Sequence, residues 1–316
     1  MKPFYLIIGL CGALGSSLVF STKLTGQDQV ASDSSVLKKI VILTGDDLKH
    51  ASGTHEFEAG GKLLKASIEK SVINDRVECV LVHNWPEDTS VFNDADMILH
   101  YYKGNKWHLV NKNAALIDAL AKKGVSQMFV HYACDPDSSV DESLRSWTGG
   151  VYKDKVSANP YWTLNAILEK HPINKGVSQY TVNDEWYLNI DFEKLPLKEY
   201  DAVKVGDVHA VMSGKNVDKK PHGKFNRAVK DDDGSATVVF WAKESENGCR
   251  GIAVTGAHFH KTWANDDFRK QVLNSITWGL KISVPESGVS SPAITEDQLN
   301  ENLDKRKPRQ KRVKLN

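Results

Sequence analysis

The chain has 316 residues, which is enough for one large domain or two ordinary ones. Its 41 basic and 40 acidic residues give a formal net charge of +1, so the composition implies no polyanionic partner such as a nucleic acid. Hydrophobic residues make up 41% of the sequence, which indicates a soluble globular protein with a sizeable core.

The N-terminal segment predicts export. Lys2 precedes an apolar stretch from Phe4 to Phe20, and Val19-Phe20-Ser21 is an acceptable cleavage site. The stretch is rather short for a membrane span, so we predict a signal peptide over residues 1–21. The mature protein is then periplasmic or secreted, with no transmembrane span. A lipid anchor at Cys11 is the alternative, although Leu10 is too large for a good lipobox.

The cysteines predict neither a disulfide scaffold nor a structural zinc site. Cys79, Cys134 and Cys249 remain after cleavage, an odd number that allows at most one disulfide, and no CxxC pair exists. Cys134 lies near the place of a nucleophile elbow, but the G-x-C-x-G turn is absent. We therefore expect no glutaminase activity.

The first half of the chain alternates strands and helices. Residues 22–37 are small and polar and predict a linker. Apolar runs predict buried strands at 39–43, 77–83, 97–101 and 127–132, and helical patterns lie at 63–72 and 109–120. This order predicts a parallel sheet covered on both faces. No GxGxxG motif and no P-loop follows a strand, so we expect no nucleotide cofactor.

The second half is less regular and predicts a β-rich insertion in a single α/β domain over residues 38–282. The patterns indicate a short helix at 141–147, turns at 159–162 and 171–173, strands at 180–190 and 203–211, and a loop at 215–233. Strands at 237–242 and 252–254 and a helix with Phe268, Val272, Ile276 and Leu280 on one face follow. Residues 283–316 predict a solvated polar tail, basic from Lys305 to Lys314.

Histidines and tyrosines follow several of the predicted strands. The carboxyl-terminal loops of parallel strands lie at one edge of a sheet, so these side chains are expected to form one rim. If the chain stays extended through Phe259, His258 and His260 point to the same side. The candidates are His50 and His55 after the first strand, Tyr101 and His108 after the third, His131 and Tyr132 after the fourth, and His258 and His260 after the last.

Two kinds of chemistry fit such a rim. Neutral imidazoles are common zinc ligands, so one divalent metal ion could be held by His131, His258 and His260. Histidine and carboxylate can equally act as general base and acid, with Asp184-Glu185 as the best internal carboxylates. We predict catalytic roles for His55, His131, Glu185 and His258. The predicted substrate-binding residues are Tyr132, Trp186, His222, His260 and Trp263. The alternative is that the histidines are ordinary loop or core residues and the tryptophans are core packing.

Several motifs resemble the ThuA-like (trehalose-utilisation) family. They include HASGTHEF at 50–57, FNDADMILHYY at 92–102, NDEWY at 183–187 and GAHFHKTWANDDFRKQVLNSITW at 256–278, and together they span roughly residues 38–285. The resemblance implies a flavodoxin-like sheet of the class I glutamine-amidotransferase-like type, whose ThuA-like members usually lack the cysteine nucleophile. One departure is the turn from Lys103 to His108, where relatives often carry glycines. Here Trp107 is expected to reshape the pocket.

The combined expectation is an exported protein that acts on or binds a carbohydrate or modified sugar in saccharide catabolism. If it is an enzyme, a hydrolase, lyase or isomerase is expected. The alternative is a non-catalytic sugar-binding or envelope scaffold protein on the same fold. The sequence does not predict the substrate or the oligomeric state.

Overall fold

A computed structural model describes residues 36–193, 205–218, 235–305 and 312–315. The predicted signal peptide, nearly all of the predicted linker, His222 and most of the basic run near the C-terminus lie outside these residues. Within the described ranges, no helix has both the length and the apolar character needed to span a bilayer.

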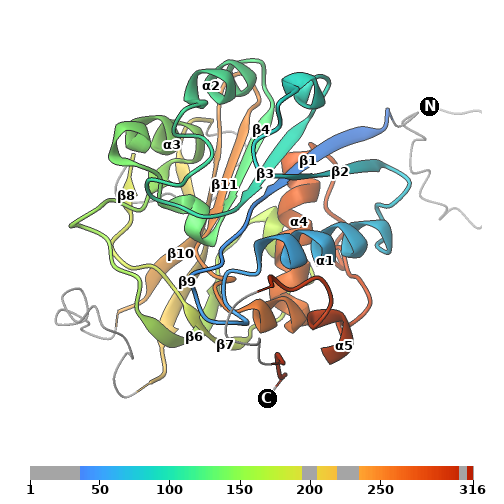
Figure 1. Ribbon diagram of the computed structural model, residues 1–316, viewed down its shortest axis with the longest axis vertical. Coiled ribbons are helices and arrows are strands. Elements are labelled where there is room, and N and C mark those ends of the chain that lie inside the picture. Colours follow the sequence, from blue (N-terminus) through green and yellow to red (C-terminus); the bar gives the residue numbers. More distant parts are fainter. Residues whose placement is uncertain (1–35, 194–204, 219–234, 306–311, 316) are drawn as a thin grey trace, which may run out of the picture. The chain divides into compact units, whose positions relative to one another are not determined.

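A nine-stranded mixed sheet forms the centre of the molecule, in the order β2-β1-β3-β4-β11-β10-β9-β6-β7 (Figure 1). The first five strands in this order are mutually parallel and form what we call the parallel half: β2 (Val77–His83), β1 (Lys38–Thr44), β3 (Met97–Tyr101), β4 (Ser126–Val130) and β11 (Arg250–Val254). The other four pair antiparallel and form the antiparallel half: β10 (Thr237–Glu244), β9 (Val208–Asn216), β6 (Tyr161–Leu168) and β7 (Thr181–Glu185). The predicted mostly parallel α/β sheet is confirmed.

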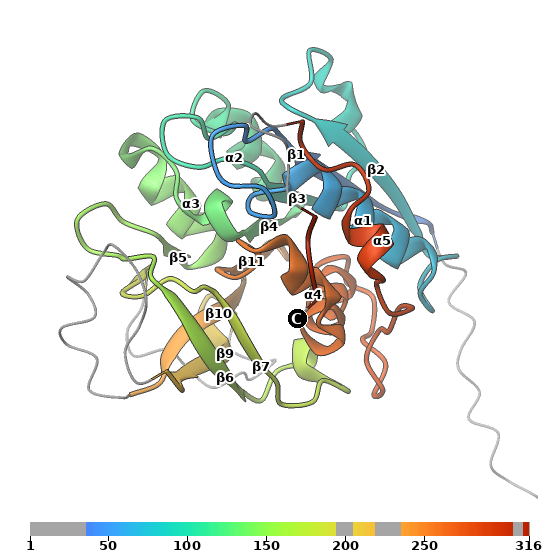
Figure 2. The same ribbon diagram turned by 60° about the horizontal axis from the view of Figure 1, so that its bottom comes forward.

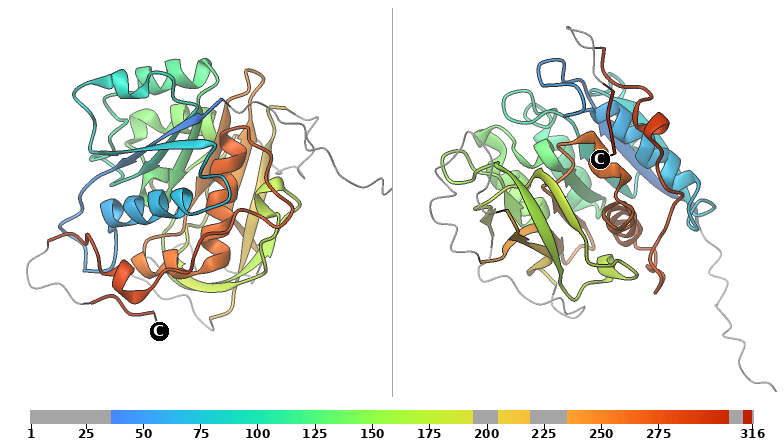
Figure 3. Two further views of the ribbon diagram at one scale, coloured as in Figure 1. Left: turned by 90° about the vertical axis from the view of Figure 1, so that its right-hand side faces the viewer. Right: turned by 90° about the horizontal axis from the view of Figure 1, so that it is seen from below.

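Helices cover both faces of the sheet, as predicted (Figure 1, Figure 3). On one face α1 (Phe57–Glu69) and α4 (Asp266–Gly279) bury apolar side chains against Ile42, Leu99 and Val254. On the other face α2 (Ala114–Lys122) and α3 (Asp141–Thr148) pack on Leu43 and Phe129. Successive strand residues point to opposite faces, which explains why the buried strands supply both apolar layers. A separate pair, β5 (Gly150–Val151) and β8 (Asp191–Phe192), lies outside the large sheet.

Several element boundaries differ from the sequence predictions, among them that of the strand predicted at 203–211, which is β9 (Val208–Asn216). The helix predicted through Val72 ends at Glu69, and Val72 is 64% exposed. The helix predicted from residue 109 begins only at Ala114, and the strand predicted to residue 190 ends at Glu185.

The structure also contains a strand, β6, where the sequence predicted turns around residues 159–162. Proline favours an extended conformation in the preceding residue and is tolerated at the beginning of a strand, so Pro160 precedes β6 without interrupting it. Within β6, Trp162, Leu164 and Ala166 alternate inward, which is the period-two pattern of a half-buried strand.

The segment after Ile282 packs on the domain rather than extending from it as a tail. Val289 and Leu299 are fully buried, and the short helix α5 (Glu296–Leu299) lies beside α1 (Figure 2). Farther along, the Asp47 backbone N–H donates to Asp304 Oδ2 (3.2 Å), and the Asp304 N–H donates to Glu56 Oε2 (2.9 Å). Apolar burial and these hydrogen bonds make residues 283–305 part of the α/β unit.

Candidate metal centre

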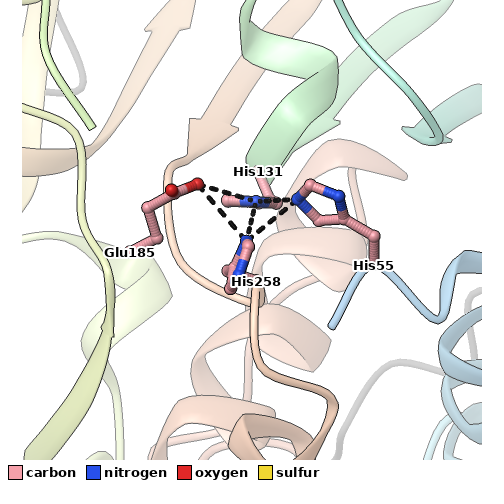
Figure 4. A group of neighbouring side chains, drawn as sticks. All are labelled: His55, His131, Glu185 and His258. Atoms are coloured by element: carbon pink, nitrogen blue, oxygen red, sulfur yellow. Dashed lines mark hydrogen bonds and ion pairs between the residues drawn. The ribbon is translucent and has the colours of Figure 1, made fainter. Parts of the chain in front are cut away.

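Three histidines and one glutamate meet at the carboxyl edge of the parallel half (Figure 4). His55 lies in the loop between β1 and α1, His131 directly follows β4, and His258 follows β11. Glu185 is the last residue of β7 and reaches the group from the antiparallel half. All four are buried, with exposed fractions of 7% or less. The predicted convergence of loops thus brings together residues from four distant parts of the sequence.

The four side chains direct single atoms at a common point. His55 Nε2 lies 3.0 Å from His131 Nε2 and 2.9 Å from His258 Nδ1, and the latter two are 3.2 Å apart. Glu185 Oε2 lies 3.5 Å from His131 Nε2 and 3.3 Å from His258 Nδ1. Zinc–nitrogen bonds of about 2.0–2.1 Å place the ligands of a tetrahedral ion about 3.3 Å apart. The spacing therefore matches a four-coordinate site.

Hydrogen bonds at the far side of two imidazoles fix which nitrogen faces the centre. His131 Nδ1 donates to the Thr255 carbonyl oxygen (2.8 Å), and His55 Nδ1 donates to Asp47 Oδ2 (2.8 Å). In neutral imidazoles both Nε2 atoms then carry lone pairs that face each other. Two such lone pairs at 3.0 Å repel, whereas a cation between them would be bound by both. A carboxylate or carbonyl behind each ligand histidine is the usual outer arrangement of metal sites.

Burial keeps these imidazoles neutral, as metal ligation requires. Loss of hydration and the neighbouring His258 lower the pKa of His131 to about 3. Loss of hydration likewise lowers the pKa of His258 to about 4, and it holds the pKa of His55 well below its usual range. Burial raises the pKa of Glu185 to about 7, so this carboxyl can exchange a proton near neutral pH.

Asp47 orients His55 from behind. Burial alone would raise the pKa of this carboxyl, but hydrogen bonds from His50 and His55 outweigh burial and lower it. His50 Nδ1 lies 2.5 Å from Asp47 Oδ2, and Lys103 Nζ lies 3.3 Å from Oδ1. Asp47 was not among the residues predicted from the sequence. The available signal was an aspartate after the first strand with histidines three and eight residues later.

Asp184 holds the loop that carries His258. Its carboxylate accepts the backbone N–H groups of Ala257 (2.9 Å), His258 (3.0 Å) and Phe259 (3.2 Å). It also accepts the Thr262 hydroxyl (2.5 Å). Asp184 is therefore a positioning residue, and its neighbour Glu185 faces the centre. The sequence patterns named Asp184 and Glu185 together as the best internal carboxylates and did not distinguish their roles.

Two further polar groups at the centre were not predicted. The Asn159 amide donates to Glu185 Oε1 (3.2 Å), which leaves Oε2 directed at the histidines. The Tyr161 hydroxyl lies 3.1 Å from His258 Nε2 and is 37% exposed. Both residues lie just before or at the start of β6, the strand that the sequence patterns did not reveal.

Backbone conformation is unusual at the same place. His55 (φ 52°), His131 (φ 53°) and Ala257 (φ 78°) all have left-handed backbone angles. Such conformations cost about 1–2 kcal/mol in non-glycine residues and cluster at functional sites. The sharp strand-to-helix turn at which α/β hydrolases carry a nucleophile is here occupied by His131. Cys134 is fully buried, and burial raises the pKa of its thiol, so it is not placed to act as a nucleophile.

His260 does not join the centre. The chain turns at Ala257 and enters a short 3-10 helix at His260, although Phe259 between the two histidines is extended. His260 is buried, and its backbone N–H donates to the Gly53 carbonyl oxygen (2.9 Å). The predicted ligand set of His131, His258 and His260 is replaced in space by one containing His55 and Glu185.

The other residues predicted for the site lie either beside the three histidines or in the core. The Tyr132 ring stacks on the His55 ring with 5.2 Å between centroids, so Tyr132 lies at the centre. Trp186 and Trp263 are fully buried in the core and present no surface to a ligand. His108 is also a core residue, because its Nε2 donates to the Ala133 carbonyl oxygen (2.9 Å).

No family model matches the sequence, and no curated protein gives a significant match. Solved structures do match. A protein described as thua-like from Bacteroides uniformis aligns with a TM-score of 0.50 and 15% identity, over 77% of this chain and 91% of that one. A thua-like protein from Parabacteroides merdae aligns with a TM-score of 0.51 and 13% identity, over 84% and 100%. The chain has the ThuA-like fold.

A glutamine amido transferase from Methylobacillus flagellatus also aligns, with a TM-score of 0.36 and 8% identity, over 72% of this chain and 75% of that one. The shared ThuA-like fold agrees with the motifs noted in the sequence. The identities of 15% and 13% with the two thua-like structures show the fold alone and leave activity to be argued from the site.

Proposed function

We propose that this chain is an exported ThuA-like protein that binds one divalent metal ion and acts on a carbohydrate or modified sugar. His55, His131 and His258 would hold the ion, with Glu185 beside them as proton carrier or fourth ligand. The observation that carries the proposal is the convergence of four buried donor atoms at the spacing of a tetrahedral metal site. Neutral imidazoles with one carboxylate suit zinc, and other first-row divalent ions fit the same donors.

The chemistry assigned to this centre follows from its donors. A bound divalent ion supplies Lewis acidity toward a sugar oxygen or a water molecule. Glu185 Oε2 faces the histidines and can hold or release a proton there, while Asn159 keeps Oε1 fixed. Tyr161 and Tyr132 line the side of the centre that faces solvent and would orient the substrate. A carbohydrate as substrate is supported by the ThuA-like resemblance.

Burial of the ligands favours a second candidate, a non-catalytic sugar-binding or envelope scaffold protein. Structural zinc sites are closed by four protein ligands, whereas catalytic sites keep one position for water or substrate. With Glu185 as a fourth ligand the centre would be closed. With Glu185 as a proton carrier, the three histidines would leave one position open.

Elemental analysis of the purified protein, paired with a thermal-shift screen of saccharides and a turnover assay on each hit, tests the proposal. We expect one divalent ion per chain and turnover of at least one saccharide. His131→Ala and His258→Ala should lose the ion and the turnover while the circular dichroism spectrum stays native. His100→Gln is a matched control, because it removes a buried imidazole outside the centre.

The two candidates give different results in this experiment. Saccharide binding with no turnover, in a protein that holds the ion, favours the scaffold. Turnover that persists in both alanine variants contradicts a catalytic centre at these histidines.

A further inference from the structure

An exposed tryptophan with three lysines lies beside the metal centre. Trp107 is 43% exposed, and three ammonium groups approach its ring. Lys103 Nζ lies 4.3 Å from the ring centroid, Lys106 Nζ 4.6 Å and Lys49 Nζ 5.2 Å. We call these four residues the Trp107–lysine cluster. It combines two segments, the loop after β1 and the turn after β3.

The turn that carries Trp107 is fixed against the loop after β4. Any side chain at Gly104 would clash with the Tyr132 carbonyl oxygen, so this position requires the close backbone approach of glycine. The Asn105 N–H donates to the Asp135 carbonyl oxygen (2.5 Å). The cluster is therefore held next to residues that directly follow the ligand His131.

A short chain of hydrogen bonds joins the cluster to the metal centre. Lys103 Nζ lies 3.3 Å from Asp47 Oδ1, and Oδ2 of the same carboxylate accepts from the ligand His55. His50, which is exposed, also contacts Asp47 and lies with its ring 6.4 Å from the Tyr132 ring. A molecule that reaches the centre past His50 and Tyr132 would meet the lysines.

The cluster holds more positive charge than its neighbours balance. Lys103 has the Asp47 carboxylate as a partner. Lys49 and Lys106 are exposed, and neither forms an ion pair with a carboxylate in the described part of the chain. Three ammonium groups around one ring repel one another, and attraction to the indole face offsets only part of this repulsion. An anion bound between them would remove the imbalance.

We infer that the Trp107–lysine cluster is a subsite for an anionic group of a saccharide substrate. The inference rests on the proposed carbohydrate function and specifies its substrate class: a sugar that carries a carboxylate, sulfate or phosphate group. The ammonium groups bind the anionic substituent, and the exposed indole offers an apolar surface for the C–H groups of the sugar ring. The alternative is that the aliphatic parts of the three lysine side chains only shield the indole from solvent.

Calorimetric titration of the metal-containing protein with glucose, glucuronate, glucose 6-sulfate, glucose 6-phosphate and inorganic sulfate tests the subsite. We expect at least one acidic sugar to bind about tenfold more tightly than glucose, with the preference falling as salt rises. The three acidic sugars distinguish the kind of anion. The variant Lys49→Gln/Lys106→Gln should lose the preference, because it removes the two unpaired charges and leaves Lys103 and Asp47 intact.

A matched control removes the same charge elsewhere. Lys62→Gln/Lys65→Gln on α1 changes two lysines that pair with Glu58 and Glu69, and it should keep the preference. Iodide quenching of tryptophan fluorescence gives an independent readout. Iodide should quench the wild type more than Lys49→Gln/Lys106→Gln, while neutral acrylamide quenches both equally.

Each contrary result has a separate meaning. If glucose binds as tightly as every acidic sugar, the subsite is refuted and the proposed function stands. If no sugar binds although the ion is present, both fail. Inorganic sulfate that binds as tightly as the acidic sugars shows an anion site without sugar recognition, which overturns the inference. Acidic-sugar affinity or iodide quenching that is unchanged in Lys49→Gln/Lys106→Gln also overturns it.

Discussion

The two halves of the sheet contribute to the metal centre in different ways. The parallel half supplies three histidines from the loops after β1, β4 and β11, which lie at one edge because the strands share a direction. The antiparallel half supplies Glu185 at the end of β7, together with Asp184, Asn159 and Tyr161. One half carries the three histidines proposed as ligands, together with Asp47 behind His55, and the other supplies a carboxylate and the groups that position His258 and Glu185.

The difference shows how a common fold can acquire a particular site. A parallel sheet brings its carboxyl-end loops together whatever their sequence. The antiparallel strands place groups there only through their own register. If this division is correct, removal of a histidine of the parallel half should remove the ion, and removal of a positioning group such as Asp184 or Asp47 should destabilise the protein or loosen the ion.

The largest effect is expected for His131→Ala, which removes a ligand supplied by the parallel half. Removal of one of four donors should weaken metal affinity by more than about 100-fold, the upper end of the loss caused by outer partners of metal ligands. Competition with a chelator of known affinity measures this change. If the ion is retained at full stoichiometry, the assignment of His131 as a ligand is wrong.

Asp184→Asn, a substitution in the antiparallel half, should destabilise the protein. The amide cannot accept all the backbone N–H groups that Asp184 now accepts from residues 257–259, so buried donors lose their partners. We expect a loss of about 3 kcal/mol in the free energy of unfolding, measured by urea denaturation. Asp88→Asn serves as a control, since Asp88 accepts a backbone N–H at an exposed site. Equal losses in the two variants would contradict the positioning role.

Asp47→Asn tests the outer partner of His55 in the parallel half. The amide keeps the size of the side chain but removes the charge that fixes the His55 tautomer. Substitutions of this kind lower metal affinity by about 10- to 100-fold. The neighbouring exposed Asp46→Asn should leave affinity unchanged. Wild-type affinity in Asp47→Asn would show that His55 needs no charged partner.

The last prediction concerns the acid stability of the parallel half. Burial lowers the pKa of His100 to about 3 in the folded protein, whereas the same imidazole has its ordinary pKa of 6.5 in the unfolded chain. Between these values the unfolded state binds a proton that the folded state does not. The contribution of His100 to stability is therefore complete above about pH 6.5 and falls as the pH drops toward 3. His100→Gln should reduce the slope of unfolding free energy against pH in this window by about 1.4 kcal/mol per pH unit.

The slope is measured by urea denaturation at a series of pH values with chelator present, so that a metal ion does not contribute. The slope reports only the proton that His100 binds on unfolding. A loss of packing in the variant lowers the free energy of unfolding at every pH and leaves the slope unchanged. The exposed His83→Gln is the control. An unchanged slope in His100→Gln would show that another group accounts for acid sensitivity.

The sequence predicted the parallel half well, because the hydrophobic patterns that define its strands and helices are local. The run Val77–His83 is a strand with the predicted bounds, and Phe268, Val272 and Ile276 are buried on α4 as the predicted helix requires. The position of His55 and His131 at one edge followed from strand direction alone. These inferences need only hydrophobic periodicity and the geometry of parallel strands.

The antiparallel half was harder, since its contribution depends on distant partners. Nothing local to Asp184 and Glu185 shows that one carboxylate caps the loop at residue 257 while its neighbour faces the histidines. His260 was misplaced because a non-glycine residue, Ala257, adopts a left-handed conformation that sequence patterns do not reveal. Trp186 and Trp263 were assigned to a cleft, although large aromatic residues fill cores more often.

The hydrogen bond between Asp47 and Asp304 affects how late in folding the loop that bears His55 reaches its final conformation. These residues are 257 positions apart, and their hydrogen bond ties the loop that bears His55 to the C-terminal segment. A contact between such distant residues forms late, because a long stretch of chain must first be ordered. The ribosome makes residue 304 long after residue 47, so this loop can reach its final form only after the residues between them exist. For an exported chain, the ion would then be taken from the compartment in which folding finishes.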